Sequence, residues 1–366
     1  MYAVAAANPD RLARLPRARN VHRAALLDGS TERSGVEARF NVDARVRDFR
    51  ARVQTELDGV EDFLQDCCQA SGVSLIDEVW THLMRAPGKR LRPTLLLLST
   101  KAHRGASEHR VMAGAVVEMI HTATLIHDDV VDKATVRRGQ PAVNRRWHDG
   151  IALMMGDFLY SKGFELFTGA GLRAEMAVLA ATTNRMSVAE MMQFEYHAKL
   201  DMREDEYLLL IREKTAALIE ASCTLGALLA GASSTSPVAT YGNNVGLAFQ
   251  ITDDLLDYLG DEYVVGKPVG SDLRDGKVTL PLIMALGNAP VEERRRMQED
   301  IRSGAIFNGQ WSRMIRFVET HGGIEAALSR ARAFGERAKS SLLELPRTPE
   351  RDALSDAVDF IINRCN

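Results

Sequence analysis

Two clusters of aspartate residues with the pattern D-D-x-x-D are the strongest chemical signal in the sequence. They are Asp128, Asp129 and Asp132 in the first cluster and Asp253, Asp254 and Asp257 in the second. Both lie in apolar, helix-like sequence, where like charges at helical spacing repel each other and buried carboxylates need partners. Carboxylate oxygens suit Mg²⁺, which commonly bridges to substrate phosphates. The clusters therefore predict two helices facing each other across one cavity that binds metal and phosphate, in preference to two solvated acidic faces.

Basic residues in short motifs supply partners for phosphate groups. They are Lys89, Arg90 and Arg92 in GKRLRP, Arg137 and Arg138 after the first acidic cluster, Lys214 in REKTAALIE, and Lys267 and Lys277 around the loop after the second cluster. A helix that begins at GKRLRP would add the attraction of its N-terminal amides. His121 lies two helical turns before Asp128, and we interpret it as a phosphate donor rather than a core histidine. Any one such residue is usually solvated surface, so only the whole set indicates a phosphate site.

The composition is ordinary for a soluble globular protein. The chain has 366 residues, of which 46 % are hydrophobic and 26 % charged, and its formal net charge is −3. The chain as a whole is therefore not positively charged, which argues against nucleic acid as a partner. The four cysteines form no C-x-x-C pair, which disfavours a zinc site or a disulfide framework and favours a reducing compartment. The best candidate for a membrane span, 216–232, is short and contains Glu220, so we predict a buried core helix there.

Hydrophobic residues recur at three- and four-residue steps from about residue 43 onward, which is typical of amphipathic helices. The predicted helical segments are 91–102, 108–132, 151–168, 173–199, 205–232, 238–259, 278–288 and 323–343. Alternating β-branched runs are missing, and 263–281 is rich in glycine, proline and aspartate, which predicts a loop. We predict an all-α fold with one large helical domain over 43–366.

Residues 1–42 differ from the rest of the chain because they contain many arginines, few acidic residues and two prolines. We predict a disordered basic arm, with an organellar transit peptide or a start-site artefact as alternatives. The segment lacks the uninterrupted apolar region of a secretory signal. We accordingly expect a cytoplasmic protein, or one of an organelle matrix if the arm is a transit peptide.

The motifs together resemble those of the trans-isoprenyl diphosphate synthases, or polyprenyl synthetases, over roughly residues 45–365. In the family's order they are GKRLRP, HTATLIHDDVVD followed by RRG, GDFLY, KTAALIEAS, FQITDDLLDY and GKPVGSDLRDGKVTLP. The sequence is most similar to long-chain members of octaprenyl and decaprenyl type, which make the side chains of respiratory quinones. The resemblance implies the isoprenoid synthase fold, a bundle of helices around a deep apolar cavity, and a homodimer.

The resemblance also implies a Mg²⁺-dependent, head-to-tail condensation of isopentenyl diphosphate with an allylic diphosphate. The six aspartates would hold about three Mg²⁺ ions that grip the allylic diphosphate. The residues that match the isopentenyl diphosphate site are Lys89, Arg92, His121 and Arg138. The residues that match the allylic diphosphate site are Arg137, Lys214, Thr215, Gln250, Lys267 and Lys277. Metal ions and cations would stabilise the departing diphosphate, and apolar walls would keep water from the carbocation.

Product length in this family depends on bulk beneath the first aspartate cluster, where short-chain members carry an aromatic residue. Here Ala123 and Thr124 occupy that level, with Ile120 and Val117 one and two turns deeper. Small residues would leave a tunnel open for a product of about eight to ten isoprene units, whose lipid character implies transient contact with a membrane surface. The alternatives are that Ala123 only permits close helix packing, and that the product is short-chain farnesyl or geranylgeranyl diphosphate.

Other proteins of related type fit the sequence less well. A class I terpene cyclase usually carries an Asn/Ser/Glu-type second motif and needs no isopentenyl diphosphate site. A regulatory subunit would generally have lost aspartates, whereas a catalytic subunit that needs a separate small partner remains an alternative. An intramembrane aromatic prenyltransferase would need transmembrane spans. Two segments depart from the family pattern: RRWHDGIAL, which contains His148 and Asp149, and the aromatic AEMMQFEYHAKLD.

Overall fold

The computed structural model describes residues 49–69, 72–86, 88–233, 236–259, 270–307 and 309–365, all within one compact unit, Val42–Asn366. The predicted arm over 1–42 and Lys267 lie outside the described residues, and the expectations for them stay predictions. The elements in chain order are α2 (Gln54–Gln69), α3 (Ser74–Met84), α4 (Leu91–Ala102), α5 (Arg110–Val131), β1 (Val136–Arg137), β2 (Gln140–Pro141), α6 (Val143–Arg146), α7 (Asp149–Gly169), α8 (Arg173–Glu195), α9 (Glu204–Ile211), η2 (Arg212–Ala216), α10 (Ala217–Leu229), α11 (Pro237–Leu259), α13 (Ser271–Arg274), α14 (Leu280–Asn288), α15 (Val291–Arg302), η3 (Ala305–Phe307), α16 (Trp311–Thr320), α17 (Gly323–Leu342), α18 (Pro349–Ile362) and η4 (Asn363–Cys365).

The predicted all-α fold is confirmed, and most of the segments predicted from the apolar periodicity are helices. The segment predicted over 91–102 is α4, and the segment predicted over 108–132 is α5, which has Asp132 as its C-cap. The segment predicted over 205–232 is interrupted, because α9 passes into a turn of π-helix, η2, before α10 begins. Within the described ranges the only strands are β1 and β2, which pair as a short antiparallel hairpin.

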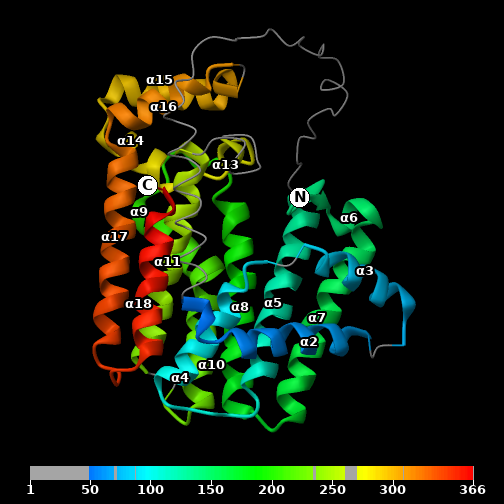
Figure 1. Cartoon of the computed structure of the whole chain (residues 1–366). Coiled ribbons are helices and arrows are strands. Elements are labelled where there is room, and N and C mark those ends of the chain that lie inside the picture. Colours follow the sequence, from blue (N-terminus) through cyan, green and yellow to red (C-terminus); the bar gives the residue numbers. More distant parts are fainter. Residues whose placement is uncertain are drawn as a thin grey trace, which may run out of the picture. The chain divides into compact units, whose positions relative to one another are not determined.

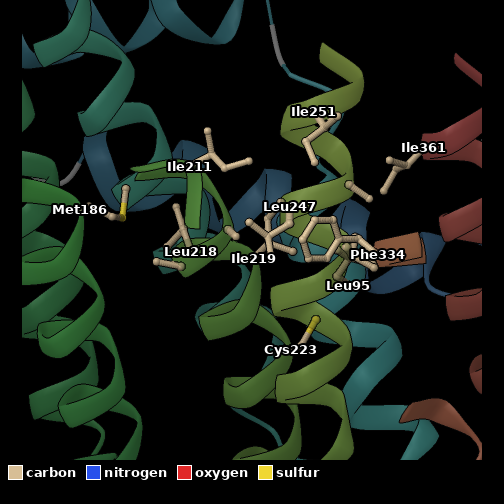
Figure 2. Close-up of a cluster of buried hydrophobic side chains, with 14 of the residues drawn as sticks. Leu95, Met186, Ile211, Leu218, Ile219, Cys223, Leu247, Ile251, Phe334 and Ile361 are labelled. Atoms are coloured by element: carbon tan, nitrogen blue, oxygen red, sulfur yellow. The ribbon is translucent and has the colours of Figure 1, made fainter. Parts of the chain in front are cut away.

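Helix α4 belongs to the hydrophobic core on all sides. Its four consecutive leucines, 95–98, are fully buried, because α5, α10 and α18 pack around this helix. Burial of each leucine stabilises the fold by about 1.5–3 kcal/mol. Figure 2 shows Leu95 in a cluster with Cys223 of α10, Leu247 of α11 and Phe334 of α17. One continuous core therefore joins N-terminal and C-terminal helices.

Close packing of the long helices brings the two acidic motifs to the same end of the bundle. Figure 1 shows α5, α7, α8, α11, α17 and α18 running alongside one another, with α2 lying across α5 and α7. A Cβ atom on Gly226 would lie 2.3 Å from the carbonyl oxygen of Leu96, so only glycine lets α10 approach α4 so closely. None of the helices in the described part of the chain is long and apolar enough to cross a membrane.

Candidate active site

Four of the six predicted aspartates line one cavity of about 410 Å³, which we call the acidic cavity. Asp128 and Asp132 lie at the C-terminal end of α5, and Asp253 and Asp254 lie near the C-terminal end of α11. Residues four apart share a helix face, which places Asp128 and Asp132 together. The shared cavity that the two motifs predict is therefore present, whereas the metal-binding role of its aspartates stays a prediction.

Asp129 and Asp257 are not among the residues that line this cavity. Asp129 is 4 % exposed and forms an ion pair with Arg137, whose Nε lies 2.8 Å from Oδ1. Asp257 accepts hydrogen bonds from the backbone N–H groups of Ser271 (3.1 Å) and Asp272 (3.2 Å), and so holds the first turn of α13. The structure thus brings four aspartates to the cavity and gives the other two protein partners that fix neighbouring elements.

Two carboxylates of the acidic cavity, those of Asp128 and Asp254, are largely withdrawn from water. Burial raises the pKa of Asp128 to about 6, although the nearby ammonium group of Lys214 opposes the rise. Burial also raises the pKa of Asp254, although Tyr207 and Gln250 donate hydrogen bonds of 2.6 and 2.7 Å to its two oxygens. Ionised carboxylates in such a site gain stability from added positive charge, so the cavity favours cations.

The ligand atoms of the acidic cavity fit a divalent cation such as Mg²⁺. Carboxylate oxygens are the preferred ligands of this ion, which keeps several waters and takes other oxygens from substrate phosphates. Within the described residues, no three His, Cys, Asp or Glu side chains converge closely enough to hold a metal ion by themselves. A metal bound with the help of substrate phosphates needs no such complete set. Asp128, Asp132 and Asp253 are the residues that would contribute.

Cationic side chains at the edge of the acidic cavity are paired with carboxylates. Lys214 Nζ donates to Glu190 at 2.9 Å, and Lys277 Nζ lies 3.0 Å from Asp132 Oδ2. Lys214 and Thr215 belong to the π-helical turn η2, and π-helical turns within helices are frequent at functional sites. Five of the residues predicted for the allylic diphosphate line this cavity: Arg137, Lys214, Thr215, Gln250 and Lys277.

The hairpin formed by β1 and β2 separates the two arginines that follow the first aspartate cluster. Arg138 and Gly139 occupy its two-residue turn with φ angles of 51° and 76°, the left-handed conformations that a type I′ turn requires. Arg137 pairs with Asp129 and lines the acidic cavity, whereas Arg138 lines a second cavity. Of these two adjacent arginines, one therefore lines the acidic cavity and the other lines the second cavity.

The second cavity has a volume of about 440 Å³, and we call it the basic cavity. All four residues predicted for isopentenyl diphosphate line it: Lys89, Arg92, His121 and Arg138. Burial, together with the charge of Arg138, lowers the pKa of Arg92 to about 10, and Arg92 Nε is buried without a hydrogen-bond partner. Burial and the neighbouring arginines hold the pKa of His121 well below its usual value, so its imidazole is neutral. Crowded cations and an unsatisfied donor indicate a site for a polyphosphate anion.

Several residues of both cavities were not predicted from the sequence. Arg364 lines the basic cavity, lies 5.3 Å from the ring centroid of Phe249 and pairs with Asp253 at 3.4 Å. Arg50 lines the same cavity from the other end of the described chain. Neither arginine belongs to a motif, and only the fold brings them to this place. His197, from the aromatic segment that departs from the family pattern, lines the acidic cavity.

The residues predicted to set product length lie on α5 before the first aspartate cluster. Ala123 and Ile120 are fully buried, α5 packs along α7, and Thr124 Oγ1 donates to the carbonyl of His121 at 2.7 Å. These three residues are not among those that line the acidic and basic cavities. Their effect on product length stays a prediction.

In this all-α bundle a carboxylate-lined cavity adjoins a cation-lined cavity, an arrangement that suits an enzyme acting on phosphorylated substrates. Residues 73–312 match the family model of polyprenyl synthetase. The chain is 37 % identical over 289 residues to the short chain isoprenyl diphosphate synthase of Methanothermobacter thermautotrophicus, covering 77 % of this chain and 88 % of the relative. It is 34 % identical over 320 residues to the geranyl-diphosphate-specific all-trans-nonaprenyl-diphosphate synthase of Rhodobacter capsulatus, covering 87 % of this chain and 98 % of the relative. The chain belongs to the polyprenyl synthetase family and is a prenyltransferase.

A solved structure supports the same assignment. Polyprenyl synthase from Caulobacter crescentus, complexed with calcium and isoprenyl diphosphate, aligns with a TM-score of 0.82 at 32 % identity, covering 88 % of this chain and 98 % of that one. Other relatives are named geranylgeranyl and octaprenyl diphosphate synthases, and one from Geobacillus stearothermophilus is named heptaprenyl diphosphate synthase component 2. The relatives therefore share one class of reaction but differ in the length of their products.

Proposed function

We propose that the protein is a Mg²⁺-dependent synthase that condenses isopentenyl diphosphate with an allylic diphosphate, head to tail, into a long-chain all-trans polyprenyl diphosphate. The observation that carries this proposal is the adjacency of two cavities with opposite charge. Asp253 of the acidic cavity lies 3.4 Å from Arg364 of the basic cavity, so two diphosphate-bearing substrates would bind close to each other. The use that we propose for the product is the side chain of a quinone.

In the proposed reaction the acidic cavity binds the allylic diphosphate. Mg²⁺ held by Asp128, Asp132 and Asp253 would neutralise the charge of the diphosphate as it leaves. Lys214 and Lys277 would exchange their carboxylate partners for phosphate oxygens and add positive charge at the edge of the cavity. The allylic C–O bond breaks, its electron pair leaves with the diphosphate, and the positive charge remains on the allylic carbons. Charges already in place lower the barrier because they match the charge that develops in the transition state.

The basic cavity holds isopentenyl diphosphate beside the allylic group. Its diphosphate would be bound by Lys89, Arg92, His121 and Arg138. The double bond then attacks the allylic carbon, a new C–C bond forms, and a proton is lost to the released diphosphate. His121, being neutral, would donate a hydrogen bond to the bound diphosphate. The product again carries an allylic diphosphate, so the chain can grow by one isoprene unit in each cycle.

The test of this function is a product assay with purified protein, Mg²⁺, labelled isopentenyl diphosphate and farnesyl diphosphate, with products sized by chromatography. We expect a ladder of products that ends between octaprenyl and decaprenyl diphosphate and that is lost when a chelator removes the metal. Termination at geranylgeranyl diphosphate would keep the enzyme class and assign a short-chain synthase. Turnover that requires an added second subunit would favour the heteromeric alternative, as the name of the Geobacillus relative suggests.

Replacing Ala123 by phenylalanine is expected to shorten the product to farnesyl or geranylgeranyl length. Ala123 is fully buried on α5, one to two turns before Asp128, so an added ring would enter the space that we propose for the growing chain. The extra volume should also destabilise the fold by about 1–3 kcal/mol. Product sizing measures the effect, and Ala123→Gly, which adds no bulk, serves as the control. An unchanged ladder from an active Ala123→Phe protein would place the end of the tunnel elsewhere.

We propose that the protein is a homodimer through α7 and α8. Five large hydrophobic side chains on these helices are 40 to 67 % exposed: Leu153, Met154, Val188, Met191 and Phe194. Apolar side chains gathered on an exposed face commonly mark a protein interface. Sedimentation analysis should give the mass of a dimer, and Met191→Glu should shift it toward the monomer, whereas Leu343→Glu at another exposed site should not. A wild-type protein that sediments as a monomer at all concentrations would rule out this interface.

A further inference from the structure

Arg90 lines the basic cavity, yet its guanidinium group is held by two carboxylates of the protein. Its side chain is 5 % exposed. Nη1 donates to Glu118 Oε1 at 2.7 Å, Nη2 donates to Glu61 Oε2 at 2.9 Å, and Nε donates to the other oxygen of Glu61. Each nitrogen of the guanidinium group therefore has a carboxylate partner. Arg92, two residues later, has a buried Nε with no partner, so these two arginines have different roles.

The carboxylates that hold Arg90 come from two other helices. Glu61 belongs to α2 and Glu118 belongs to α5. Glu118 is 2 % exposed and lines the basic cavity, whereas Glu61 is not among the residues that line it. A bidentate contact on one side and a second carboxylate on the other fix the plane of the guanidinium group, which a lysine could not reproduce. The cluster of Arg90, Glu61 and Glu118, which we call the Arg90 cluster, thus ties the start of α4 to α2 and α5.

The backbone at Arg90 adopts a conformation that depends on such support. Its φ and ψ angles are 51° and 35°, in the left-handed region that is uncommon for residues with a side chain. The carbonyl of Arg90 accepts hydrogen bonds from the backbone N–H (3.1 Å) and the hydroxyl (2.7 Å) of Thr94, and α4 begins at the next residue. This turn lies between Lys89 and Arg92, and so sets the directions in which both side chains leave the backbone. Strained backbone of this kind persists where the surrounding structure holds it.

The same loop also locates Arg138 of the hairpin. A Cβ atom on Gly88 would lie 2.6 Å from Arg138 Nη2, so the guanidinium group packs directly on this glycine. The carbonyl of Ala86 accepts a hydrogen bond from Arg138 Nη1 at 3.3 Å. A displacement of the loop before α4 would therefore displace Arg138 as well as Lys89 and Arg92.

We propose that Arg90 is a positioning residue that makes no contact with the diphosphate, and that the Arg90 cluster holds Lys89, Arg92 and Arg138 in a convergent arrangement in the basic cavity. The inference rests on the proposed function, since it takes this cavity as the site of isopentenyl diphosphate. Glu118 also places one negative charge among crowded arginines, which lowers their mutual repulsion while the cavity is empty. Loss of the cluster should therefore weaken binding of isopentenyl diphosphate and leave binding of the allylic diphosphate, in the acidic cavity, almost unchanged.

The test compares Arg90→Lys and Glu61→Gln with Glu56→Gln, a matched control. Glu56 also belongs to α2 and pairs with Lys101 of α4 at 2.7 Å, but neither residue lines the basic cavity. Steady-state kinetics with each substrate varied in turn give the two KM values. We expect both cluster variants to raise KM for isopentenyl diphosphate by about tenfold or more and KM for farnesyl diphosphate by less than about threefold. Glu56→Gln should leave both values within about twofold of wild type. The double variant Arg90→Lys/Glu61→Gln should be no worse than the poorer single variant, because both changes break the same contact.

Each other outcome contradicts a specific part of the inference. An effect of Arg90→Lys without any effect of Glu61→Gln would contradict the role of the pair between Arg90 and Glu61 in holding the loop before α4. Equal increases in both KM values, with a lowered melting temperature, would reduce the cluster to a general structural role. If Arg90→Lys does not fold, the KM values of Glu61→Gln still test the proposal. This variant should fold, because Glu61 is partly exposed and glutamine keeps the shape of the side chain. Failure of the proposed function would look different: the wild-type protein would not consume isopentenyl diphosphate.

Discussion

Replacing Asp128 by asparagine is expected to lower kcat by about a thousandfold or more, because the change removes a negative charge that we assign to metal binding at the departing diphosphate. The free energy of unfolding, in contrast, should rise. Burial raises the pKa of Asp128 to about 6, so above this pH the folded protein holds an ionised carboxylate that it disfavours relative to the unfolded chain. The neutral amide has almost the same shape and removes this cost. Kinetics at pH 7.5 and thermal unfolding without added metal measure the two effects.

The control for this prediction is Asp359→Asn on α18. Asp359 pairs with Lys339 of α17 and is half exposed, and it lines neither cavity. Its replacement should leave kcat within about twofold and change stability by less than about 1 kcal/mol, as is usual for exposed ion pairs. If Asp128→Asn retained more than about a tenth of wild-type kcat, Asp128 would not be a metal ligand in the reaction.

The fold could be predicted where helices carry a continuous apolar stripe. The boundaries of α4 and α5 follow the sequence because Arg90 and Asp132 end the apolar periodicity. The π-helical turn η2 could not be predicted, because the apolar spacing continues through it. The extra residue that makes an α-helical turn π-helical leaves no mark in the local sequence. Helices α3, α15, α16 and α18 were also not among the predicted segments. For α15 the reason is that its surface is almost wholly charged and only Met297 is buried. Its arginines and glutamates pair along the exposed face instead.

The site could be predicted where its residues share a motif. Spacing along one helix correctly placed Asp128 and Asp132 in one cavity. It could not separate Asp129 from them, because the ion pair between Asp129 and Arg137 depends on the hairpin turn that follows α5. Arg364 lies 111 positions after Asp253, and their contact arises only when η4, the turn after α18, packs beside α11. Contacts between distant segments carry no signal in a single sequence.

Replacing Arg92 by glutamine is expected to raise KM for isopentenyl diphosphate by about a hundredfold, while KM for the allylic substrate changes little. Arg92, like Arg50, is a cation of the basic cavity whose Nε is buried without a hydrogen-bond partner. Each hydrogen bond from an arginine to phosphate contributes about 1.5–3 kcal/mol, so one or two such bonds account for an effect of this size. Titration with isopentenyl diphosphate at saturating farnesyl diphosphate measures it. Arg332→Gln, at an exposed position on α17, is the control and should leave both KM values unchanged.

Thermal unfolding distinguishes Arg92 from Arg90, although both belong to GKRLRP. Burial and the charge of Arg138 lower the pKa of Arg92 to about 10, which means that the folded protein disfavours this charge at neutral pH. Arg92→Gln should therefore leave the melting temperature unchanged or raise it. Arg90→Lys should lower it, because the buried carboxylate of Glu118 or the partly exposed carboxylate of Glu61 loses its partner. A lower melting temperature for Arg92→Gln would show that Arg92 also supports the fold, and its effect on KM could then no longer be assigned to phosphate binding alone.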